Sequence, residues 1–367
     1  MHVFRSGKNA APFEEAVTMR SHGRIPRRPI LGTVAALGAG LLPGCTSGAV
    51  DKRTASAAGA GSKTGSAVLK VWLLGTGGPE LSTERQGMST LIEAGGQRLL
   101  FDVGRGATQN MYESRISPKD VTKVFLTHLH NDHYEDLPAL WLTPWFLLGR
   151  KERLQVWGPA GTAGMVEGMR AMYAHDVEHR SNDLFKKDDL KVRVHDVRAG
   201  VVYDEGGVKV TAFTVEHKEG NPAYGYRLDY AGRSVLLSGD TTYDPHVVEH
   251  GMGVDVLIHN VIAFNKKLTV SGDRKAIEAK LTTPEQAARV FSKTRPRLAV
   301  YSHIAKKHLH GKEGDEQIVR RTRKAGYDGR LQMGQDRMTI EIGDEVTVKP
   351  PASTADLPEL DGPDVRL

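Results

Sequence analysis

The sequence has almost no cysteine and no long apolar run, and each shortage excludes a class of protein. A single cysteine among 367 residues, Cys45, rules out an intrachain disulfide framework and any zinc finger built on cysteine. No stretch reaches the roughly 20 apolar residues that a membrane-spanning helix needs. Ordinary proportions of charged (26%) and hydrophobic (39%) residues exclude wholesale disorder, collagen and a coiled-coil rod. The length suits one large domain or two small ones.

The excess of positive charge is concentrated at the N-terminus. The chain has a formal charge of +6, but residues 1–44 hold six basic and two acidic residues, a net of +4 that leaves +2 for the rest. The balance is therefore poor evidence for nucleic-acid binding. Arg27 and Arg28 precede the uncharged run 29–44, which is too short for a permanent span but typical of a signal sequence. This pattern resembles a twin-arginine export signal.

The two ends of the chain are expected to lie outside the fold. The apolar run ends in Leu-Pro-Gly-Cys, which resembles a bacterial lipoprotein processing box, so we expect residues 1–45 to be an export signal and Cys45 to be a lipid anchor to a membrane. The protein would then be periplasmic or otherwise extracytoplasmic. The alternative is a disordered basic tail with one incidental cysteine. Residues 46–67, rich in Gly, Ala, Ser and Thr, predict a flexible linker, and 350–367 a disordered tail.

Strand and helix signals alternate over the remaining domain, 68–349. Apolar segments of strand length occur at 68–74, 89–94, 98–103, 123–126, 154–157, 191–197, 208–215, 224–230, 234–237, 254–258 and 298–301. Thr283-Pro284-Glu285 predicts a helix start, with a cap, a proline at the first helical position and an acid in the first turn. Mixed hairpins and strand–helix units predict an α/β sandwich of layers.

The densest chemical signal is the segment 127–133, Thr-His-Leu-His-Asn-Asp-His. Four metal-capable side chains follow an apolar strand directly: His128, His130, Asp132 and His133. At a strand end, residues i and i+2 point the same way, so the first two histidines can hold one ion. The chain then turns into a helix, which carries the other two toward a second ion. Imidazole and carboxylate ligands suit zinc, with manganese or iron as alternatives.

Ligands from elsewhere must complete such a site. His217, Asp240 and His303 each follow a predicted strand, and the ends of strands gather at one rim in open α/β sheets. Any one of them alone would be an ordinary hydrogen-bonded polar residue. The packed motif is harder to explain without metal, because four polar side chains after a buried strand need other partners.

These motifs resemble the metallo-β-lactamase-fold hydrolase superfamily, whose His-x-His-x-Asp-His loop is matched by residues 128–133. Further motifs follow in the order of its ribonuclease Z and arylsulfatase-like branch: Leu74–Gly77, Phe101–Gly106, Trp157–Pro159, Ser238–Thr241 and Tyr301–Ile304. The resemblance covers about residues 69–346. It implies a four-layer αββα sandwich with a dinuclear metal site on one edge.

The resemblance also implies a role for each residue of the site. Two sets of ligands would share one bridging carboxylate: His128, His130 and His217 for the first ion, Asp132, His133 and His303 for the second, and Asp240 for both. Asp102 would steady the ligand loop, or else be a satisfied turn residue. His259 stands where ribonuclease Z carries a histidine in a His-Glu-Ala segment, although Asn260 replaces the glutamate. It would protonate the leaving group, and Asp132 would orient the nucleophile.

We therefore expect an exported metal-dependent hydrolase in which two divalent ions, about 3.5–4 Å apart, activate a shared water as hydroxide. Zinc is the expected metal, and small anionic esters, either sulfate esters or phosphodiesters, are the expected substrates. Export, balanced charge and the lack of a Gly/Pro-rich basic arm argue against a nucleic-acid partner. The alternatives are a lactonase or other carboxylic-ester hydrolase, a ribonuclease Z-like RNA phosphodiesterase, and a non-catalytic metal-binding lipoprotein. The resemblance suggests a homodimer.

Overall fold

The structure is a computed structural model that describes residues 69–265, 278–355 and 357. All of them belong to one compact unit, Ser62–Leu367. The export signal, the linker and most of the tail predicted from the sequence lie outside the described residues and stay predictions. None of the described helices combines the length and the apolar character needed to cross a bilayer.

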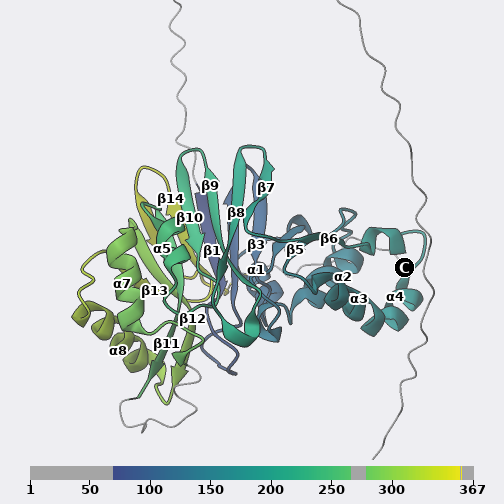
Figure 1. Cartoon of the computed structure of the whole chain (residues 1–367). Helices are drawn as coiled ribbons and strands as arrows, with labels where there is room; N and C mark the ends of the chain where they lie inside the picture. The colour runs from purple at the N-terminus through teal and green to yellow at the C-terminus, as the bar shows by residue number, and fades with distance from the viewer. Residues whose placement is uncertain (1–68, 266–277, 356, 358–367) are drawn as a thin grey trace, which may run out of the picture. The chain divides into compact units, whose positions relative to one another are not determined.

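Two mixed β-sheets form the centre of this unit (Figure 1). The first sheet has eight strands in the order β15 (Val346–Lys349), β14 (Met338–Ile342), β1 (Leu69–Gly75), β2 (Ser89–Ala94), β3 (Gln97–Phe101), β4 (Lys123–Phe125), β5 (Gln155–Gly158) and β6 (Arg193–Asp196). The second has seven, in the order β13 (Leu331–Met333), β12 (Leu298–Lys307), β11 (Val256–Phe264), β10 (Arg233–Leu237), β9 (Ala223–Tyr230), β8 (Val208–Val215) and β7 (Gly200–Glu205).

Each sheet joins an antiparallel half to a parallel half. In the first sheet β3, β4, β5 and β6 run parallel, and in the second β10, β11, β12 and β13 do. Parallel strands end at the same edge of a sheet, and the loops that leave those ends are where such sheets place their ligands. The metal-capable loop after β4 and the loop after β10 are therefore both expected at this edge.

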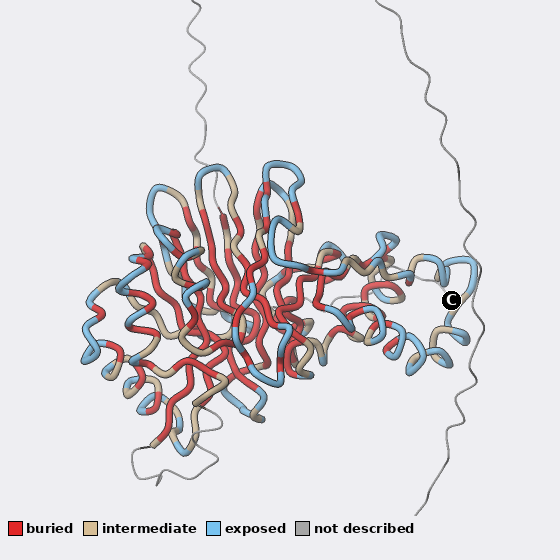
Figure 2. The backbone as a smooth tube through the Cα atoms, viewed as in Figure 1, coloured by how far each residue is buried: buried red, intermediate tan, exposed pale blue. Residues whose placement is uncertain are grey.

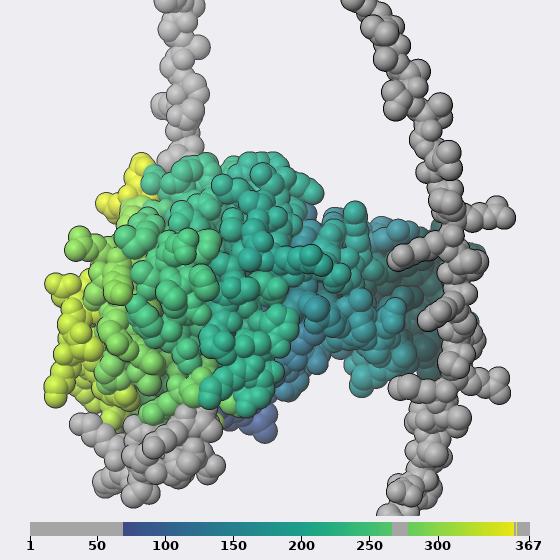
Figure 3. Space-filling model, in the orientation of Figure 1, coloured from purple at the N-terminus to yellow at the C-terminus, as the bar shows by residue number. Residues whose placement is uncertain are grey.

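Helices cover the outer faces of both sheets. The α-helices are α1 (Ala107–Glu113), α2 (Leu137–Leu147), α3 (Thr162–Met172), α4 (Ala174–Arg180), α5 (Pro245–Gly251), α7 (Pro284–Thr294) and α8 (Gly311–Lys324). Short 3-10 turns are η1 (Pro118–Asp120), η2 (Asn131–His133), η3 (Lys187–Leu190) and η4 (Lys218–Gly220). The first four α-helices lie with the first sheet, whereas α5, α7 and α8 lie with the second (Figure 1). In the space-filling view, α8 lies beside α7 (Figure 3).

Three apolar layers separate these four layers of secondary structure. One lies between the sheets, where Phe101 stacks on Phe125 and both contact Tyr226. A second lies between the first sheet and its helices and buries Trp141 and Trp145. The third lies under α5, α7 and α8. The strands are correspondingly buried along their centres (Figure 2). The predicted αββα sandwich is confirmed.

Local sequence signals explain several boundaries. Helix α7 starts with a complete capping box, in which Thr283 Oγ1 accepts from Gln286 N at 3.3 Å and Gln286 Oε1 accepts from Thr283 N at 2.9 Å. Pro284 occupies its first turn, as predicted. Gly95 and Gly96 both have positive φ, which lets them close the two-residue turn between β2 and β3.

Two expectations about the site's secondary structure were wrong. The strand predicted at 298–301 continues to Lys307, because β12 keeps pairing with β11 beyond a β-bulge: His259 pairs with Tyr301, but Val261 pairs with Ile304. His303 lies in this bulge with φ of 45°. The helix that was expected to carry Asp132 and His133 begins only at Leu137, and these two residues lie in the 3-10 turn η2 instead.

Candidate metal centre

All the side chains predicted to bind metal converge at one edge of the sandwich. They come from the loop after β4 (His128, His130), the turn η2 (Asp132, His133), the loop after β8 (His217), the loop after β10 (Asp240) and the bulge in β12 (His303). Within each of three sets of residues, the potential ligand atoms lie within 4.8 Å of one another. The sets are His128, His130 and His217; His128, His133 and Asp240; and Asp132, His133 and His303. Segments separated by more than a hundred residues therefore meet where the sequence predicted.

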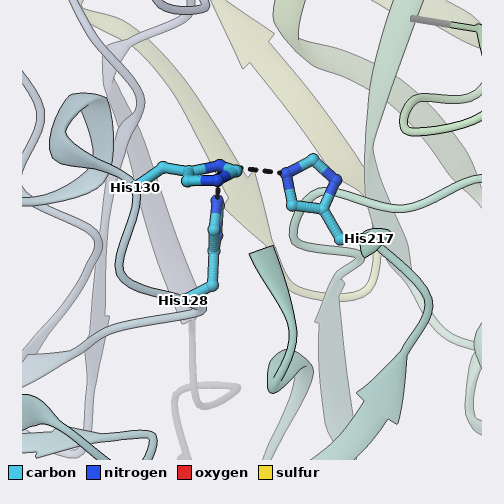
Figure 4. Close-up of side chains that lie close together, drawn as sticks. All are labelled: His128, His130 and His217. Carbon is cyan, nitrogen blue, oxygen red and sulfur yellow. Dashed lines mark hydrogen bonds between the residues drawn. The ribbon is translucent and has the colours of Figure 1, made fainter. Parts of the chain in front are cut away.

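The first group is made of three imidazole rings (Figure 4). His130 Nδ1 lies 3.0 Å from His128 Nε2 and 3.2 Å from His217 Nε2. Nitrogen ligands at 2.0–2.1 Å from a tetrahedral zinc ion would be about 3.3 Å apart, so these spacings fit one shared ion. His130 is half-buried, whereas the other two rings are buried. The open side of this group therefore lies at His130.

The second group combines two rings with carboxylates. His303 Nε2 lies 3.3 Å from Asp132 Oδ2 and 3.2 Å from Asp240 Oδ2. His133 Nε2 lies 3.6 Å from Asp132 Oδ2 and 3.7 Å from Asp240 Oδ2. Asp240 Oδ2 is also 3.7 Å from Nε2 of His217, which belongs to the first group. Asp240 thus faces both groups, as a bridging ligand must.

Outer hydrogen bonds orient the rings. Asp102, in the loop after β3, accepts from the main-chain N–H of Thr127 at 2.8 Å and pairs with His133 Nδ1 at 2.9 Å. The hydroxyl of Thr127 lies 3.1 Å from Nδ1 of His128. His217 Nδ1 donates to the main-chain carbonyl of Lys280 at 2.9 Å. The three contacts to Nδ1 atoms, of His133, His128 and His217, each leave Nε2 turned inward, the arrangement that fixes metal-binding histidines.

Gly220 is required for the placement of His217. Gly220 is the last residue of the turn η4, which His217 caps. A Cβ atom at position 220 would lie 2.1 Å from His217 Cδ2 and 3.1 Å from His128 Cδ2. Any other residue here would displace a ring of the first group. A sequence pattern does not reveal this requirement, because a loop glycine commonly serves only to turn the chain.

The electrostatics of the site call for positive charge. Burial alone would raise the pKa of Asp240, but the nearby His303 and His133 outweigh it and hold that pKa well below its usual value. Burial lowers the pKa of His133, yet Asp102 and Asp240 outweigh this and raise it well above the ordinary histidine value. Burial lowers the pKa of His128 well below normal, so that its ring is neutral. Burial also lowers the pKa of His303, but the carboxylates outweigh this and raise it above the ordinary value. Without metal, the rings of His133 and His303 are therefore the cations that partner the buried carboxylates, and a divalent ion could take that role.

The residues present fit divalent metal ions. Nε2 of His133 and Oδ1 of Asp240 are buried and have no hydrogen-bond partner among the described residues, although the surrounding layers satisfy most polar atoms. Both atoms belong to the predicted ligands. A nitrogen-rich donor set with shared carboxylates is the kind that zinc prefers, with iron and manganese also accommodated.

His259, the predicted proton donor, lies behind the ligands. It is fully buried in β11 and lines a small cavity together with Asp240 and His303. Its Nδ1 lies 2.9 Å from the carbonyl of Asn260, and its Nε2 has no partner within the described residues. Burial lowers the pKa of His259 to about 4, so the ring is neutral at pH 7. Its part in catalysis stays a prediction.

The part of the chain that matches a known protein family includes all the predicted metal ligands. Residues 97–304 match a family described as the β-lactamase superfamily domain, and that range contains every predicted ligand. This chain belongs to the metallo-β-lactamase superfamily. It is a hydrolase of the metallo-β-lactamase fold and falls on the ribonuclease Z branch of the superfamily.

Curated relatives of this metallo-β-lactamase-fold chain carry the name ribonuclease Z. The protein from Mycobacterium sp. (strain KMS) is 31% identical over 291 residues, covering 77% of this chain and 99% of the relative. That from Mycobacterium avium (strain 104) is 32% identical over 281 residues, covering 75% and 99%. These relatives match the folded domain across nearly their whole length.

Solved structures agree on the fold. The metallo-β-lactamase-fold protein YhfI from Bacillus subtilis has a TM-score of 0.57 at 15% identity, covering 75% of this chain and all of its own. The short form of human tRNase Z has a TM-score of 0.55 at 23% identity, covering 74% and 98%. At these identities the likeness concerns the fold of this superfamily member, not its substrate.

Proposed function

We propose that this protein is a metal-dependent phosphodiesterase that cleaves RNA. The observation that carries the proposal is the gathering of all seven predicted ligands at one edge of a chain that matches proteins named ribonuclease Z over 99% of their length. The relatives weigh against our sequence-based expectation that nucleic acid is not a partner. Arylsulfatase activity has no such support.

Each of the two groups of ligands would hold its own divalent ion. His128, His130 and His217 would hold one divalent ion, and Asp132, His133 and His303 the other, with Asp240 between them. Bound divalent ions would supply a water made acidic enough to attack at neutral pH, and positive charge for the oxygens of the phosphoryl group. The buried rings and carboxylates exclude bulk solvent on the inner side, so substrate approaches at half-buried His130.

The protein groups also set orientation and proton positions. Asp132 Oδ2 lies within 3.3 Å of His303 Nε2 and faces the same space as Asp240, which suits it to accept a hydrogen bond from an attacking water. Asp102 keeps the proton of His133 on Nδ1, away from the centre. His259 is fully buried and neutral at pH 7, with Nδ1 bonded to the carbonyl of Asn260, so Nε2 would first have to gain a proton before this ring could protonate a leaving group.

A second candidate is a phosphodiesterase of small anionic esters. The observation in its favour is the charge of the chain, which is nearly balanced (+2 of the total +6) once the +4 of residues 1–44 is set aside. The sequence also has no Gly/Pro-rich basic arm of the kind that would hold a large RNA. The metal centre would be the same for both candidates.

A substrate panel separates these proposals. The zinc- or manganese-loaded full chain is tested against a structured RNA with a 3′ extension, bis-aryl phosphate, aryl sulfate and a lactone, beside the His130→Ala variant. RNA cleavage lost in the variant supports the main proposal, and turnover of bis-aryl phosphate alone supports the second. Turnover of aryl sulfate or lactone alone contradicts both. Metal-loaded protein that turns over nothing is a metal-binding protein.

The location of the protein is a separate proposal. We propose that it is exported and lipid-anchored at Cys45, on the sequence evidence of the paired arginines and the following uncharged run. Mass spectrometry of the native protein should find the N-terminus at a lipidated Cys45. An intact N-terminus in membrane-free cytosol would contradict export.

A further inference from the structure

The three residues before the cap of helix α7 contact the loops of two metal ligands. The carbonyl of Lys280 accepts from His217 Nδ1 at 2.9 Å, although the two residues are 63 positions apart. The hydroxyl of Thr282 donates to the carbonyl of Thr241 at 2.7 Å. Thr241 directly follows Asp240, the ligand that faces both groups. One short segment therefore touches the support of the first group and the support of the bridging ligand.

This segment is itself firmly held. Ile262 N donates to the carbonyl of Thr282 at 2.8 Å, which attaches the segment to β11. The side chain of Leu281 packs in a small apolar cluster with Ile262, Phe264 and Ala305. Ala305 lies two residues after His303 on β12, and the capping box of α7 begins at the next residue after Thr282. Thr282 is completely buried.

The contacts have a defined effect on the ligands. A neutral imidazole that donates from Nδ1 keeps its lone pair on Nε2, and Nε2 of His217 is the atom that faces His130 and Asp240. The carbonyl of Thr241 receives a second hydrogen bond, from Asn260 Nδ2 at 2.9 Å, so two donors fix the backbone beside Asp240. Loss of one donor would let this backbone move.

We infer that residues 280–282 form a brace for the metal centre and that Thr282 is a positioning residue for the bridging ligand Asp240. Lys280 acts through its carbonyl, which sets the tautomer of His217, and not through its side chain. Thr282 acts through its hydroxyl. The inference rests on the metal centre of the proposed function, but it concerns metal affinity and does not depend on which ester is cleaved.

The test compares two threonines at opposite ends of α7. Thr282→Val removes the hydroxyl but keeps the shape of the side chain. Thr294→Val is the matched control, since Thr294 is equally buried and its hydroxyl donates to the carbonyl of Val290 within the helix, away from the ligands. Zinc affinity of the full chain is measured by competition with a chromophoric chelator, and folding by thermal unfolding.

If residues 280–282 form this brace, the threonine variants should differ in their affinity for zinc. Thr282→Val should weaken zinc binding about tenfold, the low end for loss of an outer hydrogen bond at a metal site. Thr282→Ser, which keeps the hydroxyl, should stay within about threefold of the wild type on the same grounds. Thr294→Val should bind zinc as the wild type does, even if it unfolds at lower temperature. Unchanged affinity in Thr282→Val, or an equal loss in Thr294→Val, overturns the inference.

A second measurement needs no variant. In the zinc-loaded wild type, the Nδ1–H of His217 should give a slowly exchanging downfield proton resonance, because it is bonded to a buried carbonyl. Finding His217 protonated on Nε2 overturns the role of Lys280, whether or not Thr282→Val folds. A wild-type chain that binds no zinc at all would instead defeat the proposed function, so the two failures are distinguishable.

Discussion

Asp102 Oδ2 lies 2.9 Å from Nδ1 of His133, and each of the two side chains is only 1% exposed. The same carboxylate accepts the main-chain N–H of Thr127, the residue just before the ligand motif. One buried carboxylate thus fixes both the start of the motif and its last histidine. Of the two sequence interpretations, the geometry favours the residue that steadies the ligand loop over an ordinary turn aspartate.

Asp102→Asn should therefore weaken metal binding while keeping the fold. The amide keeps the size of the side chain but carries no charge, so His133 becomes a weaker ligand. We expect zinc affinity to fall about 10–100-fold, the usual effect of losing an outer partner. Asp255→Asn is the control, because Asp255 is a buried carboxylate bonded to Ser234 N and Arg297, neither of which is a ligand. Chelator competition should show a loss only for Asp102→Asn.

Replacing a ligand should have a larger effect. His130→Ala and Asp240→Ala are each expected to lower bound metal, measured by elemental analysis, and to reduce turnover at least about a thousandfold, since the centre supplies most of the rate. Circular dichroism should stay close to that of the wild type. His175→Ala, on the exposed face of α4, is the matched control. Full activity in either ligand variant would refute the assignment of the site.

Gly220→Ala tests the close packing of the first group. The added methyl would lie 2.1 Å from His217 Cδ2, so the ring must move and zinc affinity should drop by at least about tenfold. Gly168→Ala makes the same change in the exposed middle of α3, where nothing lies within 4 Å of the new methyl. It should bind zinc normally and gain about 0.5–1 kcal/mol of stability. Equal zinc affinity in the two variants would contradict the packing.

The buried His259 should make the fold sensitive to acid. Its folded pKa is about 4, against about 6.5 unfolded, so the unfolded chain binds a proton first. Stability from this residue is complete above pH 6.5 and is lost as pH falls toward 4, by about 2–3 kcal/mol at pH 4.5. Denaturant unfolding in excess chelator should give a steeper loss for wild type than for His259→Leu. Parallel curves would show that the ring is not buried in neutral form.

The ligand motif was predictable because its information is local. His128, His130, Asp132 and His133 lie together after a buried strand, and strand-end periodicity alone assigns the first two to one ion. His217 and Asp240 could be found from the strands before them. These features reflect side-chain types and short spacings, which the sequence states directly.

Other features depend on pairing between distant strands. His303 was expected at a strand end, but β12 continues past it, since the bulge is decided by the register with β11 and not by residues near 303. The carbonyl of Lys280 carries no side-chain signature that a sequence pattern could detect. The edge strands β7 and β15 were missed because their exposed positions interrupt the apolar pattern. The three-residue edge strand β13 and the inner strand β14 were also not predicted.

The ligands are divided between the two sheets, with His128 to His133 extending from the first and His217, Asp240 and His303 from the second. Ions held here would fasten the halves of the sandwich together at one edge. Removal of metal would then release that edge and expose its loops to proteases, so the same atoms that determine turnover would also determine how long the folded protein survives.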